Sequence, residues 1–383
     1  MPAAASPRAL YVHVPFCVRK CAYCDFYSVA VGDGDPRMAA WLEALELEAA
    51  AAPDMSPQTA YIGGGTPTAS PPAALERLLA ILRDRFRMDN VEEFTVEANP
   101  GCLSADQVRL LLAAGVNRMS LGVQSMERRT LATLGRIHDP GQVRQAVDLL
   151  RHFGLRNLSL DLMFAVPGQT LADCLRDVEA VLALGPEHLS VYGLMLSAET
   201  PLGRRVDSGE LQPVADEAYV EMLQAIRERI VGEGFEHYEI SNYALPGRRC
   251  RHNMTYWRNE PYLGLGPAAA SYVGGRRWTN VADVDAYAAR LREGHSPAGY
   301  AEELSPEGRA RETAMLNLRT SDGLVVEAFR QATGFDPLEL FAEAIAIHTA
   351  SGLLEMASSG PRAIRLTPQA LPVADTVLAD FVA

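Results

Sequence analysis

The chain lacks any long hydrophobic run: no stretch approaches the roughly 18 consecutive apolar residues that a membrane-spanning helix requires. Its opening residues, MPAAASPRAL, have no basic region followed by a long apolar core, so we expect no signal peptide. Both absences predict a cytoplasmic protein. In that reducing compartment, clustered cysteines bind metals or carry redox chemistry more often than they form disulfides.

Basic residues are also scarce, with 35 Lys and Arg against 48 Asp and Glu and a formal net charge of −13. Neutralising a nucleic-acid backbone requires a clustered basic surface. We therefore expect no nucleic-acid partner, although the stretch LPGRRCRHN at 245–253 forms a local basic patch. A length of 383 residues with 48% hydrophobic residues is typical of a globular chain with room for two domains.

From 10 to 195, short β-like runs alternate with segments whose apolar residues recur at helical spacing. A further helix is predicted over 216–234, and Ser104 and Thr170 are placed to cap two of the helices. Six βα units of this kind predict a parallel sheet with helices outside it, as an open or closed barrel. The predicted strands span residues 10–16, 59–65, 93–100, 118–125, 157–168 and 188–195.

The sequence pattern divides the chain into three parts. The β/α alternation defines a core at 1–240, and helical periodicity beyond it predicts a small α-rich C-terminal domain at 301–383. Between them, 241–300 is rich in aromatic residues, Gly and Asn with weak periodicity, and we interpret it as a loop and connecting segment. A barrel of this class places its chemistry at the C-terminal ends of its strands, so residues that follow the strands are the candidate functional ones.

Three cysteines, Cys17, Cys21 and Cys24, follow the first predicted strand with the spacing C-x3-C-x2-C. A structural zinc site requires four ligands, commonly two CxxC pairs, and no second pair or suitably spaced histidine follows. Three thiolates favour a 4Fe–4S cluster with one iron left open for another ligand, and zinc remains the alternative. The other cysteines are interpreted as buried small hydrophobic residues: Cys102, Cys174 and Cys250.

Polar residues and glycines recur at or just after the ends of the first five strands. They can surround a ligand that lies across the barrel mouth, although each also has an ordinary structural interpretation as a turn, a salt-bridged carboxylate or an exposed arginine. Asp161 is the most informative, because an aspartate inside an apolar strand is costly unless it is paired. The candidates are Gly64, Gly65, Glu97, Gln124, Arg136 and Asp161.

The cysteine spacing resembles the signature of the radical S-adenosylmethionine (SAM) superfamily. The stretches YVHVPFC, GGGTPT, EANP, GVQS and DLMFAVPGQT, with the C-terminal helical domain, are similar to the oxygen-independent coproporphyrinogen III oxidase-like (dehydrogenase) group. The resemblance implies a partial (β/α)6 TIM-like barrel with a small α-rich C-terminal domain, and a 4Fe–4S cluster whose open iron binds SAM. The SAM-contacting positions that it implies are Tyr11, Tyr23, Gly64, Gly65, Thr66, Glu97, Gln124, Arg136 and Asp161.

The stretch RHNMTYW at 251–257 matches the H-N-x-x-Y-W motif of a sister branch, the heme chaperones. The resemblance implies that heme binds here. A neutral imidazole such as His252 is a good axial ligand for heme iron, and Tyr256 and Trp257 offer a flat apolar wall. The alternative interpretation is that His252 is a capped loop histidine and Trp257 a core residue. The implied heme-binding positions are His252, Asn253, Tyr256 and Trp257, with His237 and Tyr238 as secondary candidates.

The sequence therefore predicts a heme chaperone on a radical SAM scaffold. Its expected partners are heme, an apo-hemoprotein acceptor in solution or at a membrane, a reductant for the cluster, and a second copy of the chain in a homodimer. The alternative is an anaerobic coproporphyrinogen III dehydrogenase, an oxidative decarboxylase that uses a 5′-deoxyadenosyl radical. The motif of that enzyme resembles C-x3-C-x2-C-x-C, and Phe26 stands here at the last position. We assign no catalytic residue.

Overall fold

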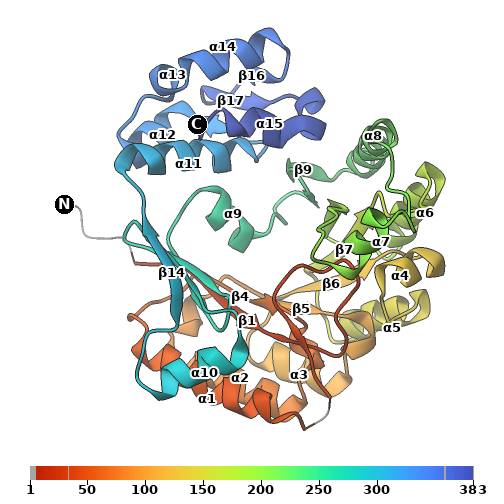
Figure 1. Cartoon of the computed structure of the whole chain (residues 1–383), viewed down its shortest axis with the longest axis vertical. Coiled ribbons are helices and arrows are strands. Elements are labelled where there is room, and N and C mark those ends of the chain that lie inside the picture. Colours follow the sequence, from red (N-terminus) through yellow and green to blue (C-terminus); the bar gives the residue numbers. More distant parts are fainter. Residues whose placement is uncertain (1–5, 33, 358, 383) are drawn as a thin grey trace.

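The computed structural model describes residues 6–32, 34–357 and 359–382. Its main feature is a 12-stranded sheet that curves into a partial barrel (Figure 1). Seven neighbouring strands of this sheet run parallel. In pairing order they are β11 (Tyr262–Leu265), β1 (Ala9–Val14), β4 (Thr59–Gly64), β5 (Glu93–Ala98), β6 (Arg118–Gln124), β7 (Leu158–Phe164) and β8 (His188–Gly193).

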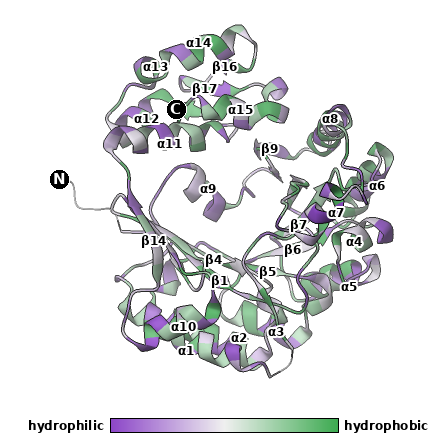
Figure 2. Ribbon diagram, viewed as in Figure 1, coloured by the Kyte–Doolittle hydropathy of each residue, from purple (hydrophilic) through white to green (hydrophobic). Residues whose placement is uncertain are grey.

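All six predicted strands are present, and each begins within one residue of its expected start. The helices follow the strands as the apolar spacing predicts, and Ser104 and Thr170 cap two of them. Their buried faces pack on the sheet, while their outer sides carry hydrophilic residues (Figure 2). The helices are α1 (Pro36–Ala51), α2 (Pro72–Arg85), α3 (Ala105–Ala113), α4 (Arg128–Leu134), α5 (Pro140–His152), α6 (Leu171–Leu182), α7 (Pro201–Asp207) and α8 (Asp216–Gly232).

The segment 241–300 is more ordered than its weak periodicity indicates. It begins with β10 (Asn242–Ala244), which pairs with β9 (Glu236–Glu239) and β8, and it adds strands beyond β1. These strands are three to six residues long, too short to produce a clear alternation. The further elements are α9 (Arg251–Trp257), β12 (Ala270–Val273), β13 (Arg276–Asn280), α10 (Val284–Arg292) and β14 (Ala298–Glu303).

Helix α9 lies inside the hollow of the curved sheet, between the sheet and the C-terminal domain (Figure 1). It contacts β4 of the barrel and α11 (Pro306–Leu318) of the C-terminal domain. It is therefore an internal element of the barrel.

The C-terminal part is mostly helical, as predicted, and also contains a three-stranded sheet in the order β15-β17-β16. Its own hydrophobic core includes Phe329, Phe341 and Phe381. Among the described residues, no helix is long and apolar enough to span a bilayer. The elements are α11, β15 (Leu324–Val325), α12 (Val326–Thr333), α13 (Pro337–Leu340), α14 (Ala342–Ala350), β16 (Leu354–Met356), β17 (Ala363–Leu366) and α15 (Ala374–Ala379).

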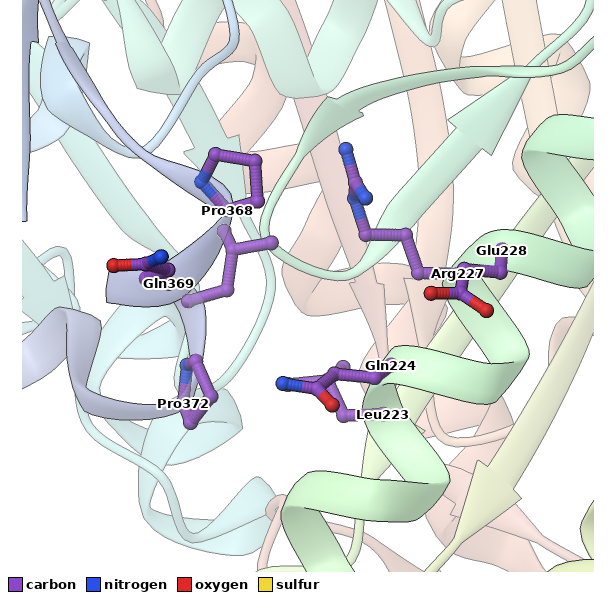
Figure 3. A pocket seen from close by; sticks show the side chains of 8 residues that line it. Leu223, Gln224, Arg227, Glu228, Pro368, Gln369 and Pro372 are labelled. Atoms are coloured by element: carbon purple, nitrogen blue, oxygen red, sulfur yellow. The ribbon is translucent and has the colours of Figure 1, made fainter.

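The C-terminal domain also approaches the barrel at α8. Figure 3 shows Gln224, Arg227 and Glu228 of α8 facing Pro368 and Gln369 across a cavity of about 260 Å³. The two parts thus share a second boundary, distinct from the one at α9. The domain limits 1–240, 241–300 and 301–383 remain predictions.

Candidate functional site

The three-cysteine loop lies beyond the C-terminal end of β1. Two short parallel strands, β2 (Phe16–Cys17) and β3 (Val29–Ala30), enclose it and bring its ends together. Cys17, Cys21 and Cys24 are free and partly exposed. Burial raises the pKa of the Cys17 thiol, and it raises that of Cys24 to about 11. Metal binding at this loop must therefore release protons from these sulfurs.

The middle of the loop is held by backbone hydrogen bonds. The amide of Ala22 donates to the carbonyl of Leu134 at 3.0 Å, and the carbonyl of Ala22 accepts from Leu202 at 2.8 Å. Gly135 ends α4 in the left-handed conformation, with φ of 72°, and a Cβ there would lie 3.0 Å from the Ala22 nitrogen. The loop is thereby fixed against the ends of α4 and α7.

Polar side chains surround the cysteine sulfurs. A guanidinium nitrogen of Arg136 donates to the Cys21 sulfur at 3.4 Å, and the Thr66 hydroxyl lies 3.6 Å from the Cys17 sulfur. Asn99 joins the two, because its amide donates to Thr66 and its oxygen accepts from Arg136. The Nε of Arg136 is buried and has no hydrogen-bond partner among the described residues.

These donors fit a cluster of anionic thiolates with a further ligand. Among the described residues, no three His, Cys, Asp or Glu side chains converge on a single metal ion. A 4Fe–4S cluster does not require such convergence, because each cysteine binds a separate iron. The open Nε of Arg136 leaves one donor free to point at a bound group.

The glycine turn after β4 brings the backbone close to the cysteine loop. Gly64 has φ of 106°, and a Cβ there would lie 2.6 Å from the ring of His13. A Cβ at Gly65 would lie 2.5 Å from the carbonyl oxygen of Phe16. Both positions therefore exclude a side chain, which is what the close approach of backbone to a ligand site requires.

Two partly exposed carboxylates line the interior of the barrel. Glu97 accepts hydrogen bonds from the Tyr61 hydroxyl at 2.7 Å and from the Gly64 amide at 3.1 Å, and burial raises its pKa to about 7. Asp161 accepts from the hydroxyls of Ser120 and Ser159 at 3.0 and 3.3 Å, and burial raises its pKa. Neither has a cation as a hydrogen-bonded partner, so both can accept donors from a ligand.

The other predicted SAM positions lie around the same interior. Tyr11 pairs in register with Tyr61 on β4, and its hydroxyl lies 3.1 Å from His13. Gln124 has φ of 64° where the β6–β7 register shifts, a left-handed conformation that is uncommon for a residue other than glycine. Tyr23 packs against a small hydrophobic cluster beneath the cysteine loop. The structure thus brings the nine positions to one end and the interior of the barrel.

The histidine of the heme motif, His252, is buried and hydrogen-bonded, so it does not offer an open axial position to heme iron. His252 is 1% exposed, and its Nδ1 lies 2.9 Å from the Thr59 hydroxyl. Its Nε2 lies 2.8 Å from the hydroxyl of Tyr256. Burial lowers the pKa of His252 to about 3, so the ring is neutral. Both ring nitrogens are occupied, and iron binding requires one of these hydrogen bonds to open.

Glu93 anchors the start of α9. One of its oxygens accepts from the Arg251 amide at 3.1 Å and the other from the His252 amide at 3.0 Å. Glu93 begins β5 and Thr59 begins β4, so both mark the N-terminal ends of the parallel strands. The heme motif therefore lies at the opposite mouth of the barrel from the cysteine loop.

The motif residues do not share one open face. The carbonyl of Trp257 accepts from Asn317 at 2.8 Å, and Arg319 lies over the indole ring at 5.4 Å, so Trp257 meets the C-terminal domain. Tyr256 contacts His252 instead. Asn253 is partly exposed on the same helix.

The two secondary candidates have structural partners. His237 stacks on Tyr243 with ring centroids 4.2 Å apart. Tyr238 is buried, and its hydroxyl lies 2.8 Å from a ring nitrogen of His188.

Several contacting residues were missed by sequence reasoning. The ring of Tyr61 lies tilted against that of His252, with centroids 5.1 Å apart, and its hydroxyl donates to Glu97, so Tyr61 contacts groups towards both ends of the barrel interior. Arg118, at the start of an apolar strand, is 2% exposed and lies near Glu93. Burying the charge of an arginine costs free energy unless a carboxylate or hydrogen bonds compensate it. An arginine at the start of an apolar strand is therefore the sequence signal that could have pointed to Arg118.

Comparisons with known proteins agree with this geometry. Residues 11–181 match the family described as the Radical SAM superfamily, and residues 304–373 match the HemN C-terminal domain. The heme chaperone HemW of Lactococcus lactis is 37% identical, with 88% of each chain covered. HemW of Bacillus subtilis is 34% identical, with 98% of this chain and 99% of that protein covered. The chain belongs to the HemW family. HemW of Escherichia coli is 39% identical over 69% of each chain.

The coproporphyrinogen III oxidase HemN of Escherichia coli has a similar fold, with a TM-score of 0.86 at 21% identity over 98% of this chain and 90% of that one. The predicted resemblance and fold class are thus confirmed. Membership of the radical SAM superfamily implies a 4Fe–4S cluster and SAM. Cys17, Cys21 and Cys24 are the residues that would hold the cluster, and the individual assignments remain predictions.

Proposed function

We propose that this protein is a heme chaperone, which binds heme and passes it to apo-hemoproteins on a scaffold that carries a SAM-binding 4Fe–4S cluster. The observation that carries the proposal is the 34–39% identity to proteins named heme chaperone HemW over most of the chain. The H-N-x-x-Y-W motif at 252–257 supports it. We place this activity in the cytoplasm.

The cluster with bound SAM supplies a redox centre at the C-terminal mouth of the barrel. In the proposal, the three cysteines hold the iron, and Arg136 fixes the loop through Cys21. Glu97 and Asp161 accept donors from SAM, and Gly64 and Gly65 let the backbone approach it. The proposed partners are a reductant for the cluster, a second copy of the chain and an acceptor hemoprotein, in solution or at a membrane.

At the other mouth, the proposed heme ligand is His252, whose neutral ring suits iron once the bond to Tyr256 or Thr59 opens. The bond to Tyr256 lies within α9, so it can open by rotation of a side chain, whereas the bond to Thr59 joins α9 to β4. Coproporphyrinogen decarboxylation is the competing function. It is disfavoured because Phe26 stands at the position of the fourth cysteine in the motif of that enzyme.

Anaerobically reconstituted protein titrated with hemin, with the Soret band as the readout, tests the proposal. We expect saturable binding and transfer of the bound heme to an apo-globin. His252→Ala should weaken binding at least about tenfold, a loss of about 1.4 kcal/mol. His295→Ala, at an exposed histidine, is the matched control.

Two results would contradict the proposal. Absence of saturable hemin binding removes the chaperone function, and decarboxylation of coproporphyrinogen above background replaces it with the enzyme activity. Unchanged hemin binding in His252→Ala removes only that residue from the heme site.

A further inference from the structure

A basic cavity lies at the N-terminal mouth of the barrel, directly outside α9. Its volume is about 400 Å³, which falls within the usual range of about 300–1,000 Å³ for small-molecule sites. It is formed by the residues that precede β5, β6 and β7 and by the loop from β10 to α9. Its lining includes Arg156, Arg248, Arg249 and Arg251, with Glu92 and Glu93.

Four arginines in one cavity are unusual for a chain with a net charge of −13. Two of them already have partners: Arg249 pairs with Asp322 at 3.0 Å and with Glu236 at 3.1 Å, and Arg251 pairs with Glu92. These pairs leave no carboxylate for the remaining two arginines, because Glu93 is occupied by the α9 amides.

The side chains of Arg156 and Arg248 make no hydrogen bond or ion pair with any described residue. Both are exposed, and they come from separate loops, one before β7 and one before α9. A planar guanidinium binds a carboxylate through two parallel hydrogen bonds. Two unpaired arginines that line one cavity are therefore suited to a ligand with two carboxylates.

We propose that the cavity binds the two propionate carboxylates of heme through Arg156 and Arg248. The inference rests on the proposed function and adds to it the place where heme first contacts the chain. Heme then reaches the barrel at the N-terminal mouth, beside Arg251, which immediately precedes His252 in α9. This carboxylate site does not require His252 to bind the iron.

The test compares hemin with hemin dimethyl ester, in which both carboxylates are blocked. The variants are R156E/R248E and a control, R83E/R144E, which makes the same change in net charge on exposed arginines outside the cavity. We expect the first variant to weaken hemin binding by at least about tenfold, about 1.4 kcal/mol. The control variant should bind hemin as the unmodified protein does.

The ester keeps the test independent of whether the variant folds well. It should bind the unmodified protein at least about tenfold more weakly than hemin does, and R156E/R248E should not weaken it further. Equal binding of hemin and ester to the unmodified protein overturns the inference and leaves the chaperone function standing. If neither hemin nor the ester binds the unmodified protein, the inference about the arginines and the chaperone function are both overturned.

Discussion

At the C-terminal mouth of the barrel, polar groups surround a partly exposed loop with three free thiols and an arginine Nε that has no partner among the described residues. At the N-terminal mouth, the groups around the heme motif already have partners. Glu93 accepts from the start of α9, and both nitrogens of His252 are engaged. The first mouth thus has open donors and thiols for a ligand, whereas at the second the hydrogen bonds of α9 close access to His252, and the cavity lies outside that helix.

This difference distinguishes the proposed binding of the cluster and SAM at the cysteine loop from the proposed binding of heme at His252. A ligand at the cysteine loop can bind to groups that are already free. A ligand at His252 must first compete with Thr59 or Tyr256, so the loss of one of these hydrogen bonds offsets part of its binding energy. Tyr61 lies between the two, against the ring of His252 and hydrogen-bonded to Glu97.

The largest effect is expected at the open mouth. Replacing Cys17, Cys21 and Cys24 together with serine should reduce iron and sulfide after anaerobic reconstitution to background, because no thiolate remains on the loop. Cys174→Ala, at a buried cysteine outside the loop, should retain the full iron content. Retention of iron in the triple variant would place the cluster elsewhere.

At the closed mouth, two adjacent glutamates form a matched pair. Glu93→Ala should lower the free energy of unfolding by about 1–3 kcal/mol, because it leaves the buried amides of α9 without acceptors. Glu92→Ala removes only the exposed pair with Arg251 and should cost no more than about 1 kcal/mol. Urea unfolding of the metal-free protein measures both. Equal losses in the two variants would show that Glu93 does not anchor α9.

A smaller effect is expected from pH at the SAM site. The pKa of Glu97 is about 7, so its carboxylate forms as the pH rises through neutrality. SAM affinity should increase by about five- to tenfold from pH 6 to 7.5, because about a tenth of such groups are ionised one unit below their pKa.

Tyr61→Phe should move this rise in SAM affinity to higher pH, since the Tyr61 hydrogen bond lowers the pKa of Glu97. Tyr300→Phe, at an exposed tyrosine, is the control. A flat SAM affinity across this pH range would mean that Glu97 does not hold SAM as a carboxylate.

The smallest effect concerns the boundary between α9 and the C-terminal domain. Arg319 lies over the ring of Trp257, and a contact of this kind is worth about 0.5–1 kcal/mol at an exposed site. Arg319 also pairs with the exposed Asp375 at 3.0 Å, so Asp375→Asn, which removes only that pair, is the control. In the urea experiment, Arg319→Gln should lower the unfolding free energy by about 0.5–1 kcal/mol more than Asp375→Asn does. No measurable change would show that the contact is unimportant for closing α9.

Most of the scaffold could be predicted from the sequence. Strands β4 (TAYIGG) and β5 (EFTVEA) are short segments rich in β-branched, aromatic and apolar residues and bounded by turns, so their starts at Thr59 and Glu93 are visible in the pattern. Ser104 and Thr170 cap helices as expected, because capping depends on residues close in sequence. The cysteine loop was found from its spacing alone.

The closure of the second mouth could not be predicted. The contact of His252 with Thr59 joins residues 193 positions apart, and no local pattern records it. The same holds for Glu93, whose role depends on α9 returning to the barrel interior from residue 251. Asp161 was expected to be paired, and its partners proved to be the hydroxyls of Ser159 on its own strand and of Ser120 on the neighbouring β6, the second of which only the register reveals.

The most direct test of the separation between the two mouths is a hemin titration of reconstituted protein with and without saturating SAM. Sites at opposite ends of the barrel predict a ternary complex, in which SAM changes the hemin affinity by less than about tenfold through the Tyr61 contact. Complete loss of hemin binding in the presence of SAM, or release of SAM by hemin, would show that both ligands occupy one site and would contradict the account.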